Sequence, residues 1–338
     1  MDHFKYNNQR ALDWLLESGD PGPAYLTMRD LIDLPEDDPA IVKACAIAHS
    51  TGPIGTLLNA MSEPGYWEQP GPGYYPKYFS TVWSICLLAQ LGADTRQDER
   101  IQRACQYYLD QALTPIGQIS ASGTSSGTVD CLQGNSCWAL TVLGFQDERL
   151  DFAYEWMARS VTGDGIAPMK DKDAEVRYYA GKCGPLFACG SNDKHSCAWG
   201  AVKILLALAA LPQDRRTPLI NAAINAGVDF IFSTDPAGAD YPHPYSAKTS
   251  GNWWKFGFPV FYITDLLQLV EAMVGLGYGR DPRLASAIQI IKDKQDFNGR
   301  WLLEYDYQGK IKLDLGTKKV PNKWVTIRAL RVLKAVEN

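Results

Sequence analysis

The sequence lacks an uninterrupted run of about eighteen apolar residues, the length that a membrane-spanning helix requires. The apolar stretch at residues 204–211 comes nearest to this and is too short to cross a bilayer. The start of the sequence also lacks a basic segment followed by an apolar one, the pattern of a secretory signal. These absences predict a cytoplasmic protein without a transmembrane segment.

Basic residues are too few and too scattered for a nucleic-acid-binding surface. The chain has 33 Lys and Arg against 38 Asp and Glu, giving a net charge of −5 and a pI near 5.5. No arginine-rich run supplies the phosphate neutralisation that nucleic acid requires, so we expect no nucleic-acid partner. At 338 residues and 46% hydrophobic, the composition is that of an ordinary globular protein.

Several catalytic signatures are missing as well. The sequence contains no Walker loop, no GxGxxG motif and no Ser/His/Asp triad signature, and the glycines at 71 and 73 belong to a proline-rich turn. The 8 cysteines do not read as a disulfide framework in a reducing compartment. Where they cluster, they indicate metal ligands or a reactive site.

What the sequence does contain is a repeated pair of helices. An apolar helix ends in Leu-Gly or Leu-Pro, and a short link bearing Asp or Arg leads to an amphipathic helix; this occurs after residues 91, 143, 211 and 276. The first helix of each pair is apolar nearly all round, which predicts burial on both sides, whereas the second has one charged face. Such repetition predicts a two-layered ring of helices.

The inner helices are expected near residue 23 or 54 and then from about 78, 131, 196, 259 and 321. Six pairs predict an all-α (α/α)6 toroid with six inner and six outer helices. A single domain would span residues 1–338, with N-terminal helices in 1–62 and repeated pairs in 63–338. The only expected strands form one short β-hairpin within 301–315, with Gln308-Gly309 at its turn.

These repeats resemble those of the prenyltransferase and squalene-cyclase superfamily, and most closely a bacterial branch of it. The likeness covers residues from about 11 to 336 and is carried by PGPGYYPKYFSTVWSICLLAQLGAD, CLQGN, HSCAWGAVK, FGFPVFY, GYGRDPRL, NGRWLLE and NKWVTIRALRVLK. The resemblance implies an α/α toroid and an enzyme, a transferase or cyclase, that acts on an apolar, isoprenoid-type substrate.

Two motifs of that superfamily are absent. The sequence has neither the Asp-x-Asp-Asp run of squalene-hopene-type cyclases nor the Asp-Asp-x-x-Asp motif that binds magnesium diphosphate. The acidic run at residues 36–38 precedes a proline and reads as a helix N-cap. A conventional class I or class II terpene cyclase is therefore disfavoured.

If the inner helices are parallel, their N-termini open onto one end of the barrel, and thiols far apart in the sequence become neighbours. Zinc favours thiolate and imidazole ligands, so we expect a zinc site there. The candidate ligands are Cys131, Cys183, Cys189, Cys197 and His195. In protein prenyltransferases an Asp-x-Cys pair and a His hold a catalytic zinc; here Asp130 directly precedes Cys131, so that spacing is not reproduced. Free thiols are the alternative reading.

Aromatic and basic side chains are expected at the same rim. Aromatic faces would hold an apolar tail and attract cationic groups, and lysines would meet an anionic head group. The alternative for each aromatic residue is core packing. The candidate substrate-binding residues are Lys77, Tyr78, Trp138, Trp199, Trp254, Lys255, Lys323 and Trp324.

Two other functions fit parts of the pattern. A non-catalytic binding or scaffold protein would use a closed four-cysteine zinc to fasten the loop that precedes residue 194. A carbohydrate-active (α/α)6 enzyme would need paired carboxylates in the barrel mouth. Its candidates are Asp164, Asp171, Asp173 and Glu175, which a solvated loop also explains.

Overall fold

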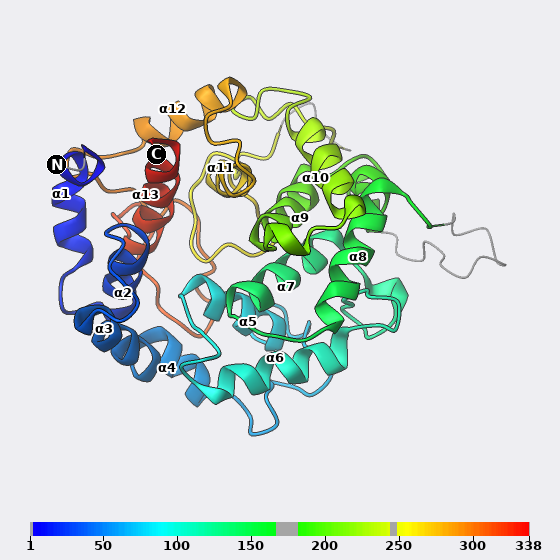
Figure 1. The fold of residues 1–338 in the computed structure, drawn as a ribbon, viewed down its shortest axis with the longest axis horizontal. Coiled ribbons are helices and arrows are strands. Elements are labelled where there is room, and N and C mark those ends of the chain that lie inside the picture. The colour runs from blue at the N-terminus through cyan, green and yellow to red at the C-terminus, as the bar shows by residue number, and fades with distance from the viewer. Residues whose placement is uncertain (1–2, 167–181, 244–248, 338) are drawn as a thin grey trace.

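The chain forms a ring of helices in two concentric layers (Figure 1). The structure, a computed structural model, describes residues 3–166, 182–243 and 249–337. In this part of the chain the inner layer consists of α2 (Pro21–Asp30), α5 (Thr81–Gln90), α7 (Asp130–Val142), α9 (Ala198–Ala210), α11 (Leu266–Gly275) and α13 (Lys323–Glu337). The outer layer consists of α1 (His3–Leu15), α3 (Pro39–Ser50), α4 (Gly52–Asn59), α6 (Glu99–Ala112), α8 (Arg149–Thr162), α10 (Pro218–Ile231) and α12 (Ala285–Asp293).

Short 3-10 turns join some of these helices: η1 (Ser125–Gly127), η2 (Pro185–Phe187), η3 (Gly190–Asn192), η4 (Gln213–Arg215) and η5 (Pro282–Leu284). The predicted all-α (α/α)6 toroid is confirmed. The first inner helix, which the sequence left open between residues 23 and 54, is α2, and its outer partner is divided into α3 and α4. None of the helices in the described ranges is long and apolar enough to cross a membrane.

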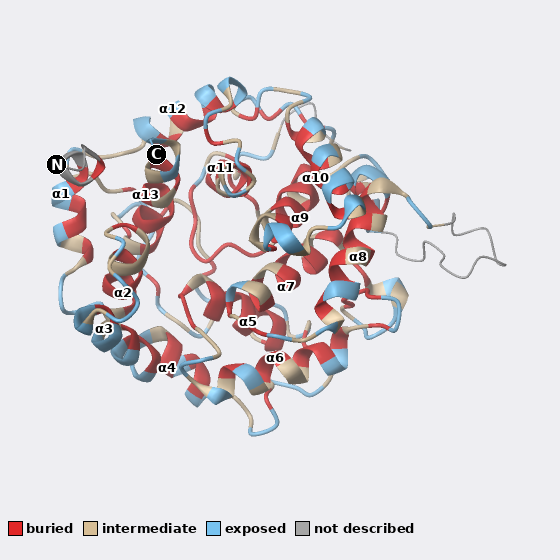
Figure 2. Ribbon diagram, viewed as in Figure 1, coloured by how far each residue is buried: buried red, intermediate tan, exposed pale blue. Residues whose placement is uncertain are grey.

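Burial follows the two kinds of helix (Figure 2). The inner helix α9 is buried nearly all round, with Ile204 and Leu205 fully inaccessible. The outer helix α6 buries Ile101 and Tyr108 on one face and exposes Asp110 on the other. The hydrophobic pattern therefore assigns each helix to its layer, because only the inner helices have protein on both sides.

The two ends of the chain close the ring together. Helix α1 packs against α13 and supplies its outer partner (Figure 1). Helix α13 is also tied to α2, because Arg331 forms an ion pair with Asp30 and Lys334 forms one with Asp33. The ring is thus held shut by contacts between segments about as far apart in sequence as the chain allows.

The inner helices run parallel to one another. On α7 and α9, Gly134 lies against Lys203, and Asp130 lies beside Gly200. A Cβ atom on Gly134 would come within 2.5 Å of the Lys203 carbonyl carbon, so only glycine permits this approach. Lys203 of α9 donates a hydrogen bond to Gln268 of α11, so α11 lies beside α9 as well. Their N-termini therefore open onto one end of the barrel, as predicted.

The segment 251–265, yellow in Figure 1, runs through the middle of the ring before α11. Gln90 at the end of α5 holds it with two hydrogen bonds: its Nε2 donates to the Val260 carbonyl (3.0 Å), and the Val260 N–H donates to its Oε1 (2.7 Å). Asp265 caps α11 by accepting from the Gln268 N–H at 2.7 Å. The inner helix expected from about residue 259 therefore begins at Leu266, because the apolar residues before it pack as an irregular segment of turns and bends, called the plug below.

The predicted β-hairpin within 301–315 is present only as a turn. The Lys310 N–H donates to the Tyr307 carbonyl (2.8 Å), but the flanking residues pair with other segments in isolated bridges, Leu302 with Pro321 and Tyr305 with Gly257. The described ranges contain no β-strand. Side chains in this segment do alternate between more and less buried positions. Its backbone groups, however, bind the central segment and the residues just before α13 instead of each other.

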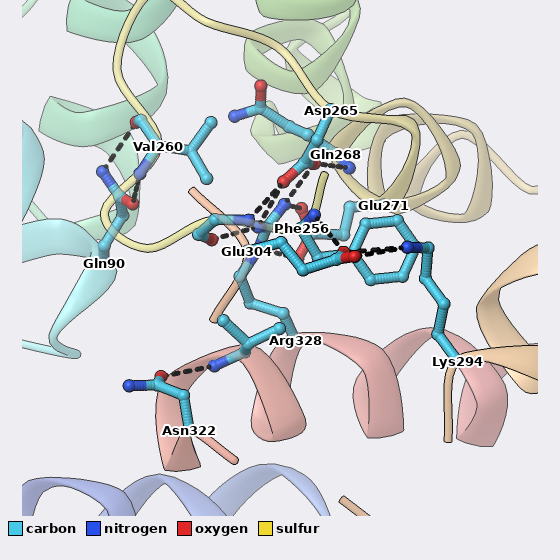
Figure 3. A network of polar contacts seen from close by, with 12 residues as sticks. Gln90, Phe256, Val260, Asp265, Gln268, Glu271, Lys294, Glu304, Asn322 and Arg328 are labelled. Carbon is cyan, nitrogen blue, oxygen red and sulfur yellow. Dashed lines mark hydrogen bonds and ion pairs between the residues drawn. The ribbon is translucent and has the colours of Figure 1, made fainter. Parts of the chain in front are cut away.

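A buried ion network fastens this central segment to the inner helices (Figure 3). Arg328 on α13 donates to both oxygens of Asp265 at 2.9 and 3.0 Å, to both oxygens of Glu271 at 3.0 and 2.7 Å, and to the Gly257 carbonyl at 2.7 Å. The Gly257 N–H donates to Asp265 in turn. One guanidinium therefore joins α13, α11 and the plug.

Candidate functional site

A cavity of about 400 Å³ opens at the N-terminal ends of the inner helices. Thiols, lysines and aromatic rings share its wall. Its lining includes Tyr74, Lys77, Val129, Cys131, Lys182, Cys189, Ser191, Asn192, Cys197, Ala198, Trp199, Tyr241, His243, Trp253 and Tyr262. Segments that lie far apart in sequence meet here because the helices that follow them are parallel.

Two short backbone pairings bring the thiols to this cavity. Val129 and Lys182 form a parallel bridge, which places the loop after residue 181 beside the start of α7. Ala188 and Ser196 form an antiparallel bridge, which folds the segment 187–197 back on itself. Cys197 is the N-cap of α9, and Cys131 lies in the first turn of α7. Cys131, Cys189 and Cys197, three of the four cysteines that were expected to meet, thus line one cavity.

Cys189 is set up to carry a negative charge. Hydrogen bonding from the Cys197 thiol is the main cause that lowers the pKa of Cys189, and the N–H groups of Ser191 and Asn192 lower it further against the opposing effect of burial. The same contact, together with burial, raises the pKa of Cys197 well above its ordinary value. One thiol of the pair therefore ionises readily while the other keeps its proton.

Behind the thiols, Asp130 is a buried carboxyl group with an incomplete set of partners. The Gly184 N–H donates to it, but its Oδ2 has no hydrogen-bond partner among the described residues. Burial, and then the charge of Cys189, raises the pKa of Asp130 well above its ordinary value. Burial also raises the pKa of Cys131, to about 12. Burial therefore disfavours a negative charge on both groups beside Cys189.

We expect Asp130→Asn to raise the free energy of unfolding at neutral pH by about 1–3 kcal/mol, because asparagine removes the cost of burying an ionisable group. Because the folded-state pKa of Asp130 is raised, the contribution of this group to stability is present in acid. That contribution is lost as the pH rises above the pKa of Asp130 in the unfolded chain. Urea unfolding at several pH values measures this: the gain should disappear in acid.

The matched control is Asp147→Asn, in which the sign reverses. Hydrogen bonding from Arg149 lowers the pKa of Asp147, so its contribution is present above the unfolded value and is lost in acid. Because this group is near the surface, we expect a loss of less than about 1 kcal/mol at neutral pH. A loss of stability in Asp130→Asn at neutral pH would show that the carboxylate is a stabilising anion instead.

Lys77 lies at the same wall with its ammonium group over aromatic faces. Its Nζ is 4.8 Å from the ring centroid of Tyr262, 5.4 Å from that of Tyr78 and 6.0 Å from that of Tyr74. Burial is the main cause that lowers the pKa of Lys77, and the charge of Lys182 lowers it further. Two lysines thus face one mouth, and none of the described residues that line it is a carboxylate, which favours an anionic ligand.

The other predicted substrate-binding residues divide between this cavity and other places. Trp199 lines the cavity beside the thiols. Tyr78 touches Lys77 and lines a smaller neighbouring pocket. Trp138 lines a separate cavity of about 400 Å³ at the C-terminal ends of the inner helices. The sequence did not show which end of the barrel the Trp138 side chain would face, because this residue lies in the interior of α7.

The remaining four point elsewhere. The Trp254 Nε1 donates to the Ala237 carbonyl at 2.8 Å, and Lys255 is exposed. Lys323 forms ion pairs with Glu17 and Asp20, at 3.2 and 2.8 Å. Trp324 stacks on Phe258 with ring centroids 5.1 Å apart. These residues lie at the start of α13 or in the segment 251–265, and their partners hold Trp254, Lys323 and Trp324 to the fold.

The predicted zinc site is not supported by this part of the chain. No group of three or more His, Cys, Asp and Glu side chains among the described residues could hold a metal ion. Cys183 is buried against Trp156, and His195 is exposed. A closed four-cysteine site, catalytic or structural, would require Cys183 to join the other three. Zinc binding stays a prediction, which elemental analysis of the purified protein measures.

The carboxylates proposed for a carbohydrate-active enzyme are placed only in part. Asp164 is exposed after the end of α8, and Asp171, Asp173 and Glu175 lie outside the described residues. The carboxyl group that the structure does place beside the thiols is Asp130, whose pKa is raised by burial, and none of the described residues that line the cavity is an Asp or a Glu.

Comparison with known proteins assigns no family to the chain. No family model and no curated protein matches its sequence. Among solved structures, a protein from Actinoplanes is 13% identical with a TM-score of 0.45, over 99% of this chain and 100% of the other. The family 76 glycoside hydrolase (mannosidase) Bt3792 from Bacteroides thetaiotaomicron is 14% identical with a TM-score of 0.48, over 94% and 85%.

The type II terpene cyclase MstE from Scytonema is 14% identical with a TM-score of 0.32, over 88% of this chain and 98% of the other. Similarity at this level carries no inference about activity. The fold and the site therefore rest on the residues of this chain.

The predicted site residues did not include Lys182, Asn192 and His243 of the cavity wall, nor the buried Lys203 of α9. The first three lie on loops, where residue type alone does not reveal direction. Lys203 left a visible signal, because it is the single charge within an otherwise apolar helix. Burial lowers the pKa of Lys203 to about 7, and its ammonium group lies near Cys131 and Asp265.

Proposed function

We propose that this protein is an enzyme that binds a small molecule with an apolar body and an anionic head in the cavity at the inner-helix N-termini. The observation that carries the proposal is the composition of one wall: three thiols, two lysines and a set of aromatic rings around about 400 Å³. A cavity of this size, largely apolar with a few convergent polar groups, suits a small-molecule ligand.

In this proposal the lysines bind one end of the ligand and the aromatic rings bind the other. Lys77 and Lys182 meet the anionic head, and Trp199, Trp253 and Tyr241 hold the apolar body. The resemblance of the sequence to the prenyltransferase and squalene-cyclase superfamily supports an isoprenoid-type body. An anionic head that leaves with an electron pair is stabilised by the same lysines.

The thiol pair supplies the reacting group. Cys189, as the thiolate, attacks an electrophilic carbon of the bound molecule; a sulfur–carbon bond forms, and the carbon–oxygen bond to the anionic head breaks. The head takes the electron pair beside the lysines. Water or an acceptor hydroxyl then attacks the same carbon; a carbon–oxygen bond forms, the carbon–sulfur bond breaks with its electron pair on Cys189, and the proton of the attacking hydroxyl leaves to solvent. Cys197 keeps its proton throughout and holds Cys189 by hydrogen bonding.

Titration with farnesyl phosphate, followed by tryptophan fluorescence, tests the proposal. We expect saturable quenching, because Trp199 and Trp253 line the cavity. Replacing Lys77 and Lys182 together by methionine should weaken binding by about tenfold or more, as expected for loss of charged contacts. Lys43→Met, on the exposed face of α3, is the matched control. Absence of quenching, or equal affinity in the double variant, would refute the proposed ligand class.

A further inference from the structure

We propose that the cavity at the C-terminal ends of the inner helices is a second ligand site, which binds a zwitterion with an apolar side chain, of the class of the aromatic α-amino acids. This cavity, called the C-terminal cavity below, has a volume of about 400 Å³. The inference does not depend on the proposed function, because no described residue lines both this cavity and the one that contains the thiols.

The wall of the C-terminal cavity is apolar over most of its extent. All six inner helices contribute to it, and the plug contributes Phe258 and Val260. A cavity of this size, largely apolar with a few convergent polar groups, is typical of a small-molecule site. The apolar wall residues include Trp138, Val142, Leu206, Val260, Val274 and Val332.

Between α2 and α13 the cavity wall carries an excess of positive charge. Arg29 donates to both oxygens of Asp30, at 2.6 and 3.1 Å, and Arg331 forms an ion pair with the same carboxylate. Two guanidinium groups thus share one carboxylate, and the nearby Lys334 is matched by Asp33. Because Arg29 and Arg331 line the cavity and are partly exposed, they are placed to bind a carboxylate of the ligand.

Between α13 and α11 the excess of charge is negative (Figure 3). Arg328 is the partner of two carboxylates, Asp265 and Glu271, and Glu271 lines the cavity and is partly exposed. Lys203 also lies near Asp265, but its ammonium group donates to Gln268 and burial lowers its pKa to about 7, so it offsets the negative charge only in part. An ammonium group of the ligand beside Glu271 balances this charge.

The two groups of charges meet on α13. Arg328 and Arg331 are three residues apart, and side chains at this spacing are neighbours on a helix surface, with Cβ atoms about 5–6 Å apart. A positive and a negative pole therefore lie within the span of one small molecule that carries both charges. The C-terminal ends of the inner helices add partial negative charge, which repels a simple anion. A zwitterion satisfies both poles, whereas an anion or a cation satisfies one.

Trp138 and the aliphatic wall residues hold the apolar side chain of the ligand. Trp138 is partly buried and lines the cavity, so an aromatic ring of the ligand packs against it. Val142, at the C-terminal end of α7, is exposed, whereas Val260 of the plug is buried. The cavity therefore extends from an open rim at Val142 to the plug, which favours a large apolar side chain over a small one.

Isothermal titration calorimetry of the full-length protein with L-phenylalanine tests the proposal. We expect saturable binding of one molecule per chain. Phenylpropionate, which lacks the ammonium group, and phenylethylamine, which lacks the carboxylate, should each bind about tenfold or more weakly, as expected for the loss of one charged contact. Glycine, which lacks the apolar side chain, should give no measurable binding.

Two charge variants and one blocking variant place the ligand in this cavity. Arg331→Met and Glu271→Gln should each weaken the binding of L-phenylalanine by about tenfold or more. Val142→Trp fills the rim from an exposed position and should abolish binding without disturbing the ion network. Arg96→Met, which removes an exposed guanidinium group paired with Asp94, is the matched control. Circular dichroism checks that each variant is folded.

Absence of binding in the wild type, or binding of phenylpropionate as tight as that of L-phenylalanine, would overturn the proposal. Unchanged affinity in Val142→Trp would overturn it too, and this variant keeps the test valid even if the loss of a charge unfolds the protein. Farnesyl phosphate, the probe for the other cavity, should bind to Val142→Trp as it binds to the wild type, so the two proposals fail separately.

Discussion

Replacing Arg328 by methionine is expected to lower the free energy of unfolding by about 3–5 kcal/mol, because it leaves one buried and one partly buried carboxylate without their partner. The Arg328 and Asp265 side chains are only 7% and 4% exposed, and Glu271 is 20% exposed. The guanidinium also holds the Gly257 carbonyl, so the central plug loses a contact as well. Urea unfolding followed by circular dichroism measures the change.

Two variants make this result specific. Arg149→Met removes the ion pairs with Asp147 and Asp110 at the surface, and we expect it to cost less than about 1 kcal/mol. Adding Asp265→Asn and Glu271→Gln to Arg328→Met should recover part of the loss, because the stranded charges are then gone. A loss under about 1 kcal/mol in Arg328→Met alone would show that the network does not hold the plug.

The layered fold could be read from the sequence because its signal is local. An inner helix such as α9 is apolar on every side, and an outer helix such as α6 has one charged face, so the periodicity of each helix reports its layer. The parallel direction of the inner helices then follows from the repeat. For this reason the sequence allowed us to predict that Cys131 lies near Cys189 and Cys197.

Helix periodicity does not predict contacts that depend on the path of a loop. Cys183 stands six residues before Cys189 in the sequence, yet it packs against Trp156 on α8. The inner helix was expected to begin at about residue 259, but Gln90 and Arg328 bind the backbone of segment 251–265, which runs through turns and bends to Leu266. Lys323 was expected at the cavity, but Glu17 and Asp20 hold it. In each case a partner distant in sequence decides the outcome.

Cys189 is expected to be the fastest-reacting cysteine at neutral pH. Its thiolate is the only one that the Cys197 thiol and the N–H groups of Ser191 and Asn192 support, and its lowered pKa keeps the reactive form present when an ordinary thiol is protonated. Cys197→Ala removes the main donor, so the pKa of Cys189 should rise and the rate at mildly acid pH should fall by about tenfold or more. Cys105→Ala, which removes a fully buried thiol, is the control.

The pH dependence of iodoacetamide labelling at Cys189, followed by peptide mass spectrometry on protein whose metal content has been measured, tests the central claim most directly. That claim is that the inner helices bring a supported thiolate to an open cavity. The account predicts a labelling midpoint clearly below the ordinary thiol value of about 8.5, shifted upward in Cys197→Ala. A midpoint at the ordinary value, or a Cys189 that labels only after zinc is chelated, would contradict it.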